Sequence, residues 1–116
     1  MTFPRRGEIH LVEFDPARGH EIRKTRPAII IQNDIGNRYS SVTIVAAITS
    51  AVSGHPVSVA VVPTKTNGLS VPSSIHLGQI RSVDRARLVK RLGMVDSATM
   101  RKVDDALRIS LGLVEI

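Results

Sequence analysis

The sequence predicts a mainly β (α+β) fold, a small twisted barrel of roughly six short strands with one α-helix at its C-terminal end. Two observations support this fold class. The six Pro and eight Gly residues are scattered between short apolar runs, as turn residues between strands are. Helical periodicity of apolar residues is convincing in one stretch only, near the C-terminus. Since no repeat or linker divides its 116 residues, the chain is expected to form one domain over residues 1–116.

The expected strands differ in how they should be buried. They cover residues 9–14, 28–32, 42–48, 57–61, 75–83 and 87–94. Residues 28–31 are continuously apolar and predict a central strand covered on both faces, whereas residues 57–61 alternate and predict a half-exposed strand. The alternation of the first strand slips at Leu11 and Val12, which indicates a bulge or two-sided burial. A turn around Asp84 and Arg85 should join the last two strands, whose Arg and Lys side chains are expected to point outward.

The helix should begin near Asp96 or Ser97, because either side chain can accept the free amide hydrogens of a first helical turn. It should end before Gly112. Its apolar residues fall on one face and are predicted to pack over the barrel as a lid; they are Met100, Val103, Ala106, Leu107 and Leu111.

Composition restricts the compartment and the partners. Sixteen Lys and Arg residues against ten Asp and Glu give a net charge of +6, which suits nucleic acid or an acidic protein tail but equally a merely soluble domain. The absence of Cys excludes a disulfide framework and a thiolate zinc site. No apolar run approaches the ~18 residues of a membrane span, and no secretory signal is visible. We therefore expect a soluble cytoplasmic protein without membrane contact.

The polar connection over residues 15–27 is much longer than a hairpin needs, and such long loops are often functional. It carries one His and four cations, which are His20, Arg18, Arg23, Lys24 and Arg26. Arg26 is the best positioned, because Pro27 fixes the backbone where the central strand starts. There it can hold a phosphate through two nitrogens and stabilise the charge of a pentavalent transition state. An ordinary ion pair at a strand end is the alternative.

A second polar pair, Thr49 and Ser50, ends the apolar run of residues 42–48. A Thr hydroxyl at a strand end can hydrogen-bond a phosphate oxygen, although Thr and Ser are also common strand terminators. The argument for Thr49 therefore depends on its combination with Arg26.

The sequence offers no set of metal ligands and few aromatic residues. His10, His20, His55 and His76 have no helical pairing and no neighbouring Cys or carboxylate cluster, so any hydrolysis is expected to proceed without a metal ion or another cofactor. His20 can transfer protons near neutral pH, while His10 is expected to be structural. With three aromatic residues, the chain must read bases through polar groups. The candidates are Asn33, Asn37, Arg38, Gln79 and Arg81.

Several blocks of the chain resemble the MazF/PemK family of toxins. The first blocks are residues 6–12, followed by Asp15 and Pro16, then Gly-His-Glu at 19–21 and Lys-Thr-Arg-Pro-Ala at 24–28. Residues 48–50, 68–69, 79–88 and 107–113 resemble the remaining blocks, in the same order and spacing. The similarity runs through nearly the whole chain.

This resemblance implies an SH3-like barrel with a C-terminal helix, forming a homodimer with single-stranded RNA across a groove at the subunit interface. It implies that Arg26 and Thr49 carry catalysis. The ribose 2′-hydroxyl would attack the adjacent phosphate and leave a 2′,3′-cyclic phosphate and a 5′-hydroxyl. Arg26 would stabilise the charge of the transition state and is a candidate for the general acid. Thr49 would orient the phosphate. The expected RNA contacts are Arg18, Arg23, Lys24, Asn37, Ser50, Gln79 and Arg81.

The sequence departs from one plasmid-borne branch of the family, which has an Arg-x-Asp pair where this chain has His76-Leu77-Gly78. The catalytic set of that branch therefore does not transfer. His20 does match the branch's Gly-His-Glu block and is a second-rank candidate for the general base. The resemblance also implies an antitoxin whose acidic tail occupies the RNA groove. Two alternatives are a toxin of the same fold that binds gyrase without catalysis and a non-catalytic RNA-binding regulator.

Overall fold

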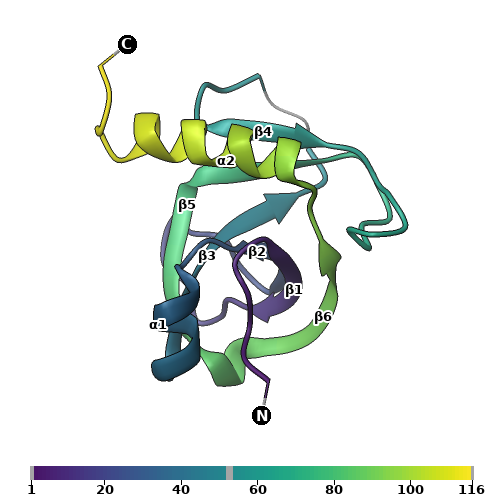
Figure 1. The fold of residues 1–116 in the computed structure, drawn as a ribbon, viewed down its shortest axis with the longest axis vertical. Coiled ribbons are helices and arrows are strands. Elements are labelled where there is room, and N and C mark those ends of the chain that lie inside the picture. Colours follow the sequence, from purple (N-terminus) through teal and green to yellow (C-terminus); the bar gives the residue numbers. More distant parts are fainter. Residues whose placement is uncertain (1, 52–53, 116) are drawn as a thin grey trace.

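The computed structural model describes residues 2–51 and 54–115. In chain order its elements are β1 (Glu8–Glu13), β2 (Thr25–Ile30), α1 (Asp34–Tyr39), β3 (Val42–Thr49), β4 (Ser58–Val61), β5 (Ser73–Asp84), a 3₁₀ turn (Arg85–Arg87), β6 (Leu88–Met94) and α2 (Ser97–Ser110). All six strands join one antiparallel sheet in the order β4-β5-β3-β2-β1-β6 (Figure 1). The predicted mainly β fold with a C-terminal helix is confirmed.

The sheet is strongly curved but is not closed into the expected barrel (Figure 1). β4 and β6 are its two edges, and no ladder joins them among the described residues. The loop between β4 and β5 lies against β6 instead, and the Met94 amide donates to the Thr66 carbonyl at 2.8 Å. Because this loop occupies the edge of β6, β4 has no free strand to pair with.

The central strand β2 is buried on both faces, as predicted. Ile29 packs into the core that lies under α2, whereas its neighbours Ala28 and Ile30 pack into a second core on the opposite face of the sheet. β1 passes between the same two cores, contributing Ile9 to the first and Val12 to the second. Its register with β6 shifts between Leu11 and Val12, which confirms the expected irregularity.

Helix α2 begins as predicted, since the side chain of Asp96 accepts a hydrogen bond from the Thr99 amide at 2.7 Å. Val103 and Ala106 are buried, and the helix packs on β4 and β5. The prediction is wrong for Leu111, which is 60% exposed. Leu111 follows the last helical turn as the C-cap, so it no longer lies over the sheet.

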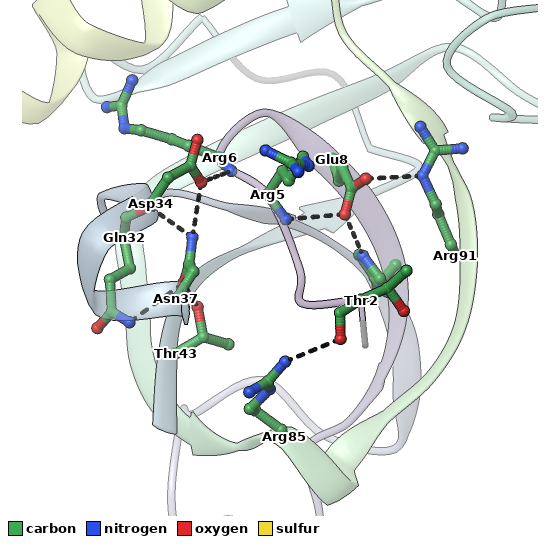
Figure 2. Close-up of polar contacts among 11 residues, drawn as sticks. Thr2, Arg5, Arg6, Glu8, Gln32, Asp34, Asn37, Thr43, Arg85 and Arg91 are labelled. Carbon is green, nitrogen blue, oxygen red and sulfur yellow. Dashed lines mark hydrogen bonds and ion pairs between the residues drawn. The ribbon is translucent and has the colours of Figure 1, made fainter. Parts of the chain in front are cut away.

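A buried carboxylate ties the N-terminal segment to the edge of the sheet. The Glu8 side chain accepts hydrogen bonds from the Arg5 amide at 2.9 Å, from His10 Nε2 at 3.1 Å and from Arg91 Nε at 2.9 Å. Figure 2 shows Glu8 between Arg5 and Arg91. Burial alone would raise the pKa of Glu8, but these hydrogen bonds together hold it below its ordinary value of 4.5.

Replacing Glu8 by Gln is expected to lower the free energy of unfolding at pH 7 by about 1–3 kcal/mol, because the Arg5 amide, His10 and Arg91 lose a charged, buried acceptor. Since the carboxyl pKa is lower in the folded state, its stabilisation is present above pH 4.5 and is lost as the pH falls through the folded-state pKa. Urea unfolding at pH 7 and pH 3 checks this result. Glu13→Gln, at an exposed site on the same strand, is the control. An equal loss for Glu8→Gln at both pH values would contradict the account.

Candidate active site

A pocket of about 380 Å³ opens at the end of the sheet where β2 begins and β3 ends. Among the described residues, Arg26 is the only charged residue that lines this pocket, and Thr49 and Ser50 line it as well. The lining residues are Leu11, Arg26, Pro27, Ile48, Thr49, Ser50, Gly68, Leu69, Ser70, Val71, Ser73 and Leu92. The structure therefore brings the predicted guanidinium and hydroxyl into one pocket.

Strand register explains why these two residues meet. β2 and β3 are antiparallel, with Ala28 opposite Ala47. Continuing this register by two residues sets Arg26 opposite Thr49. Two strand ends that are 23 positions apart in sequence thus present their polar side chains at one end of the sheet.

Arg26 is oriented by a hydrogen bond to its own loop. Its Nε–H donates to the Arg23 carbonyl at 3.0 Å, and the side chain is only partly exposed. Within residues 2–51 and 54–115, neither terminal nitrogen of this guanidinium has a hydrogen-bond partner. Two adjacent free donors on a fixed planar group are the arrangement that binds a phosphate through two oxygens.

Thr49 has a partner that the sequence analysis did not assign to the site. Its Oγ1 lies 2.8 Å from Nε2 of His76, which projects from the neighbouring strand β5. Burial, together with the nearby His55, lowers the pKa of His76 below its ordinary value of 6.5. The imidazole is therefore neutral at neutral pH. The alternation of Ile75 and Leu77 toward the core was a signal that His76 points to the other face.

The earlier part of the long polar loop, residues 15–24, does not line the pocket. Arg18, His20, Arg23 and Lys24 are exposed, and none of them is among the lining residues. Lys24 has a positive φ of 66°, a strained conformation for a non-glycine residue, and its carbonyl accepts the Phe14 amide at 2.9 Å. The loop thus has a defined turn into β2. The RNA contacts of Arg18, Arg23 and Lys24 and the role of His20 as a general base stay predictions.

Gln79 and Arg81 hold this loop in place. The Gln79 side chain accepts from the Ile22 amide and donates to the His20 carbonyl, both at 3.3 Å. Arg81 donates to the Phe14 carbonyl at the beginning of the loop. Both side chains therefore position the loop in this structure, and their expected contact with RNA stays a prediction.

The expectation that Asn37 contacts RNA is wrong for this structure, because its side chain is fully buried. It lies in helix α1, which the sequence analysis did not predict. Its Nδ2 donates to the Gln32 carbonyl and to Asp34, and its Oδ1 accepts from Thr43 and Gln32 (Figure 2). The contact with Thr43 fixes α1 against β3, and the other hydrogen bonds hold the beginning of the helix.

A second cavity, of about 560 Å³, lies beside Glu8, His10 and Arg91. A carboxylate, an imidazole and a guanidinium are an acid–base set in principle. Here both oxygens of Glu8 are already hydrogen-bonded to protein groups. The arrangement is structural, as expected for His10.

The described part of the chain contains no group of three or more His, Cys, Asp or Glu side chains placed to hold a metal ion. Among the same residues, no helix has the length and apolar character required to cross a membrane.

Comparison with known proteins identifies the family. Residues 5–111 match the model of the PemK-like, MazF-like toxin of type II toxin–antitoxin systems. Endoribonuclease EndoA of Bacillus subtilis (strain 168) is 40% identical over 112 residues, covering 96% of this chain and 97% of the relative.

Solved structures agree with the sequence match. The MazF structure from Deinococcus radiodurans superposes with a TM-score of 0.82 at 26% identity, covering 97% of this chain and 99% of that one. An endoribonuclease from Mycobacterial species, in complex with its cognate antitoxin, gives a TM-score of 0.81 at 25% identity over 97% and 99% of the two chains. The chain therefore belongs to the PemK-like, MazF-like toxin family of type II toxin–antitoxin systems.

Proposed function

We propose that this toxin is a metal-independent, sequence-selective endoribonuclease that cleaves single-stranded RNA at the pocket of Arg26 and Thr49. The observation that carries the proposal is that the oriented guanidinium of Arg26 and the hydroxyl of Thr49 line one pocket. The 40% identical relative is an endoribonuclease, which agrees with this chemistry and does not favour a gyrase-binding toxin without catalysis.

The proposed reaction uses groups of the RNA and the protein, together with water, and needs no metal ion. The ribose 2′-oxygen attacks the adjacent phosphorus, the bond from phosphorus to the 5′-oxygen breaks, and the products carry a 2′,3′-cyclic phosphate and a 5′-hydroxyl. Arg26 stabilises the added negative charge of the pentavalent transition state with its two terminal N–H groups. Thr49 orients the reacting phosphodiester by hydrogen bonding. The cation of Arg26 supplies the electrostatic stabilisation that a metal ion provides in other nucleases.

The partners follow from the family and from charge. We infer an antitoxin with an acidic, extended tail, since an endoribonuclease of the same fold is known in complex with its cognate antitoxin. The exposed cations Arg18, Arg23 and Lys24, in the loop that leads to Arg26, suit such a tail as well as RNA phosphates. We expect the active form to be a homodimer, as the family resemblance implies.

Chelation of divalent metal ions is expected to leave cleavage unchanged, because no step of the proposed reaction uses a metal. Mixed RNA is incubated with the purified toxin, with and without EDTA, and the cut ends are sequenced and tested for cyclic phosphate. Discrete cuts with cyclic phosphate ends at equal rates support the proposal. Loss of cleavage in EDTA, or retardation of RNA without any cleaved ends, would overturn it.

A further inference from the structure

We infer that His76 is a positioning residue that accepts, through Thr49, the proton released by the attacking ribose hydroxyl. This inference rests on the proposed endoribonuclease function and adds a proton path to it. Arg26 cannot serve as the base, since a guanidinium stays protonated at any working pH. The hydrogen bond between Thr49 and His76 gives the pocket a group that can take a proton.

Geometry carries the first step of the argument. Thr49 faces the pocket, and its Oγ1 is 2.8 Å from His76 Nε2. Antiparallel pairing of β3 and β5 holds the two residues together, with Thr49 opposite Ser74 and His76 opposite Ala47. Because both side chains project from paired strands of one sheet, their contact needs no loop rearrangement.

The proton path balances as follows. The 2′-oxygen forms its bond to phosphorus while its proton passes to Oγ1 of Thr49. The hydroxyl proton of Thr49 passes at the same time to Nε2 of His76, which becomes an imidazolium. The leaving 5′-oxygen takes a proton from water. The neutral hydroxyl of Thr49 is restored, and His76 then releases its proton to solvent.

The surroundings of His76 favour this direction of transfer. β5 places it between β3 and β4, and the described residues of those strands beside it, Ala47, Thr49 and Ser58, are uncharged. The ionisable group facing it is His55, ahead of β4, which with burial lowers the pKa of His76. A neutral imidazole is ready to accept a proton at neutral pH. The transfer of the proton to His76 therefore stops as the pH falls below the His76 pKa, because the imidazole is then already protonated.

The test compares single-turnover cleavage rates of an oligoribonucleotide containing the preferred cut site between pH 5 and pH 8. For the wild-type dimer we expect the rate to fall on the acid side with a midpoint below 6.5. His76→Gln keeps a hydrogen-bonding group near Thr49 but cannot accept the proton. We expect it to cleave about a hundredfold more slowly at pH 7.5 and to lose the acid limb. Its affinity for the same oligonucleotide with a 2′-deoxy substitution at the cut should be unchanged.

A second variant makes the result independent of packing at His76. His55→Gln removes the side chain whose electrostatic effect lowers the His76 pKa, so the acid-side fall in rate should move to higher pH while the rate at pH 7.5 stays the same. Wild-type rates and an unchanged acid limb in His76→Gln would overturn the inference. A His76→Gln variant that cleaves slowly but keeps the acid-side fall in rate would also overturn the inference, since the role of His76 would then be structural. The inference is overturned as well if the acid-side fall in rate disappears in His20→Gln and not in His76→Gln.

Arg26→Ala, measured in parallel, separates this inference from the proposed function. If Arg26→Ala is inactive while His76→Gln behaves as wild type, only the role of His76 fails. If Arg26→Ala cleaves like the wild type, the proposed function itself fails, whatever His76 does.

Discussion

Arg26→Ala is expected to reduce RNA cleavage by about a thousandfold while leaving the fold intact. The guanidinium provides charge stabilisation in the transition state, and loss of one such donor set typically costs two to three orders of magnitude. Among the residues that the structure describes, the guanidinium donates to the Arg23 carbonyl alone, so truncating it removes one hydrogen bond, to an exposed residue. Single-turnover rates and circular dichroism of the purified variant measure both effects.

Two control variants separate the role of Arg26 from its charge. Arg101→Ala removes the same charge from an exposed site on α2 and should cleave like the wild type apart from a small electrostatic effect. Arg26→Lys keeps the charge but cannot present two donors in one plane, and is expected to recover only a minor part of the rate. Undiminished cleavage by Arg26→Ala would refute the catalytic assignment.

Gly68→Ala is expected to lower the free energy of unfolding by about 3 kcal/mol or more, the largest stability effect we foresee. Gly68 has a φ of +72°, and a Cβ there would lie 2.1 Å from the Leu92 carbonyl oxygen. The loop would have to leave the edge of β6, which also removes one wall of the pocket. Urea titration or thermal unfolding measures the loss.

Gly112→Ala is the matched control, since Gly112 has a similar φ of +70° but open space around its Cβ position. It should cost only about 1 kcal/mol, the usual penalty for the backbone conformation alone. Equal losses in the two variants would show that the close approach to Leu92 is unimportant.

The order of apolar and polar residues along the chain predicted how individual strands are buried. The continuous apolar run predicted the doubly covered β2, and the slip at Leu11 and Val12 predicted the irregular pairing of β1. Closure of the sheet could not be predicted, because it depends on how the loop bearing Gly68 lies against β6. That contact joins segments with no shared pattern in the sequence.

Helix α1 was missed for a related reason. Residues 33–37, Asn-Asp-Ile-Gly-Asn, have the composition of a turn. The helix is held by tertiary contacts, among them the Arg6 amide on Asp34 and the Thr43 hydroxyl on Asn37. These partners lie outside the helix, in the segment ahead of β1 and on β3, so Asn37 looked like a free surface amide when it is buried.

The residues of the candidate site also differ in how far the sequence could predict them. Arg26 and Thr49 were predictable because each stands at the end of an apolar strand, next to Pro27 or Ser50. The pairing of Thr49 with His76 depends on the β3–β5 register, which includes an irregularity between Ala46 and Ala47. A sequence pattern does not reveal that register, so His76 was considered as a metal ligand and as a departure from one branch of the family, but not as a partner of Thr49.

The central claim is that one pocket holds the scissile phosphate between Arg26 and Thr49. A crystal structure of the dimer with an RNA oligonucleotide that carries a 2′-deoxy substitution at the cut site tests it most directly. The account predicts phosphate oxygens within hydrogen-bond distance of the Arg26 terminal nitrogens, with the Thr49 hydroxyl beside the 2′-position of the ribose that precedes the cut. A scissile phosphate bound elsewhere, for example in the cavity beside Glu8 and Arg91, would contradict it.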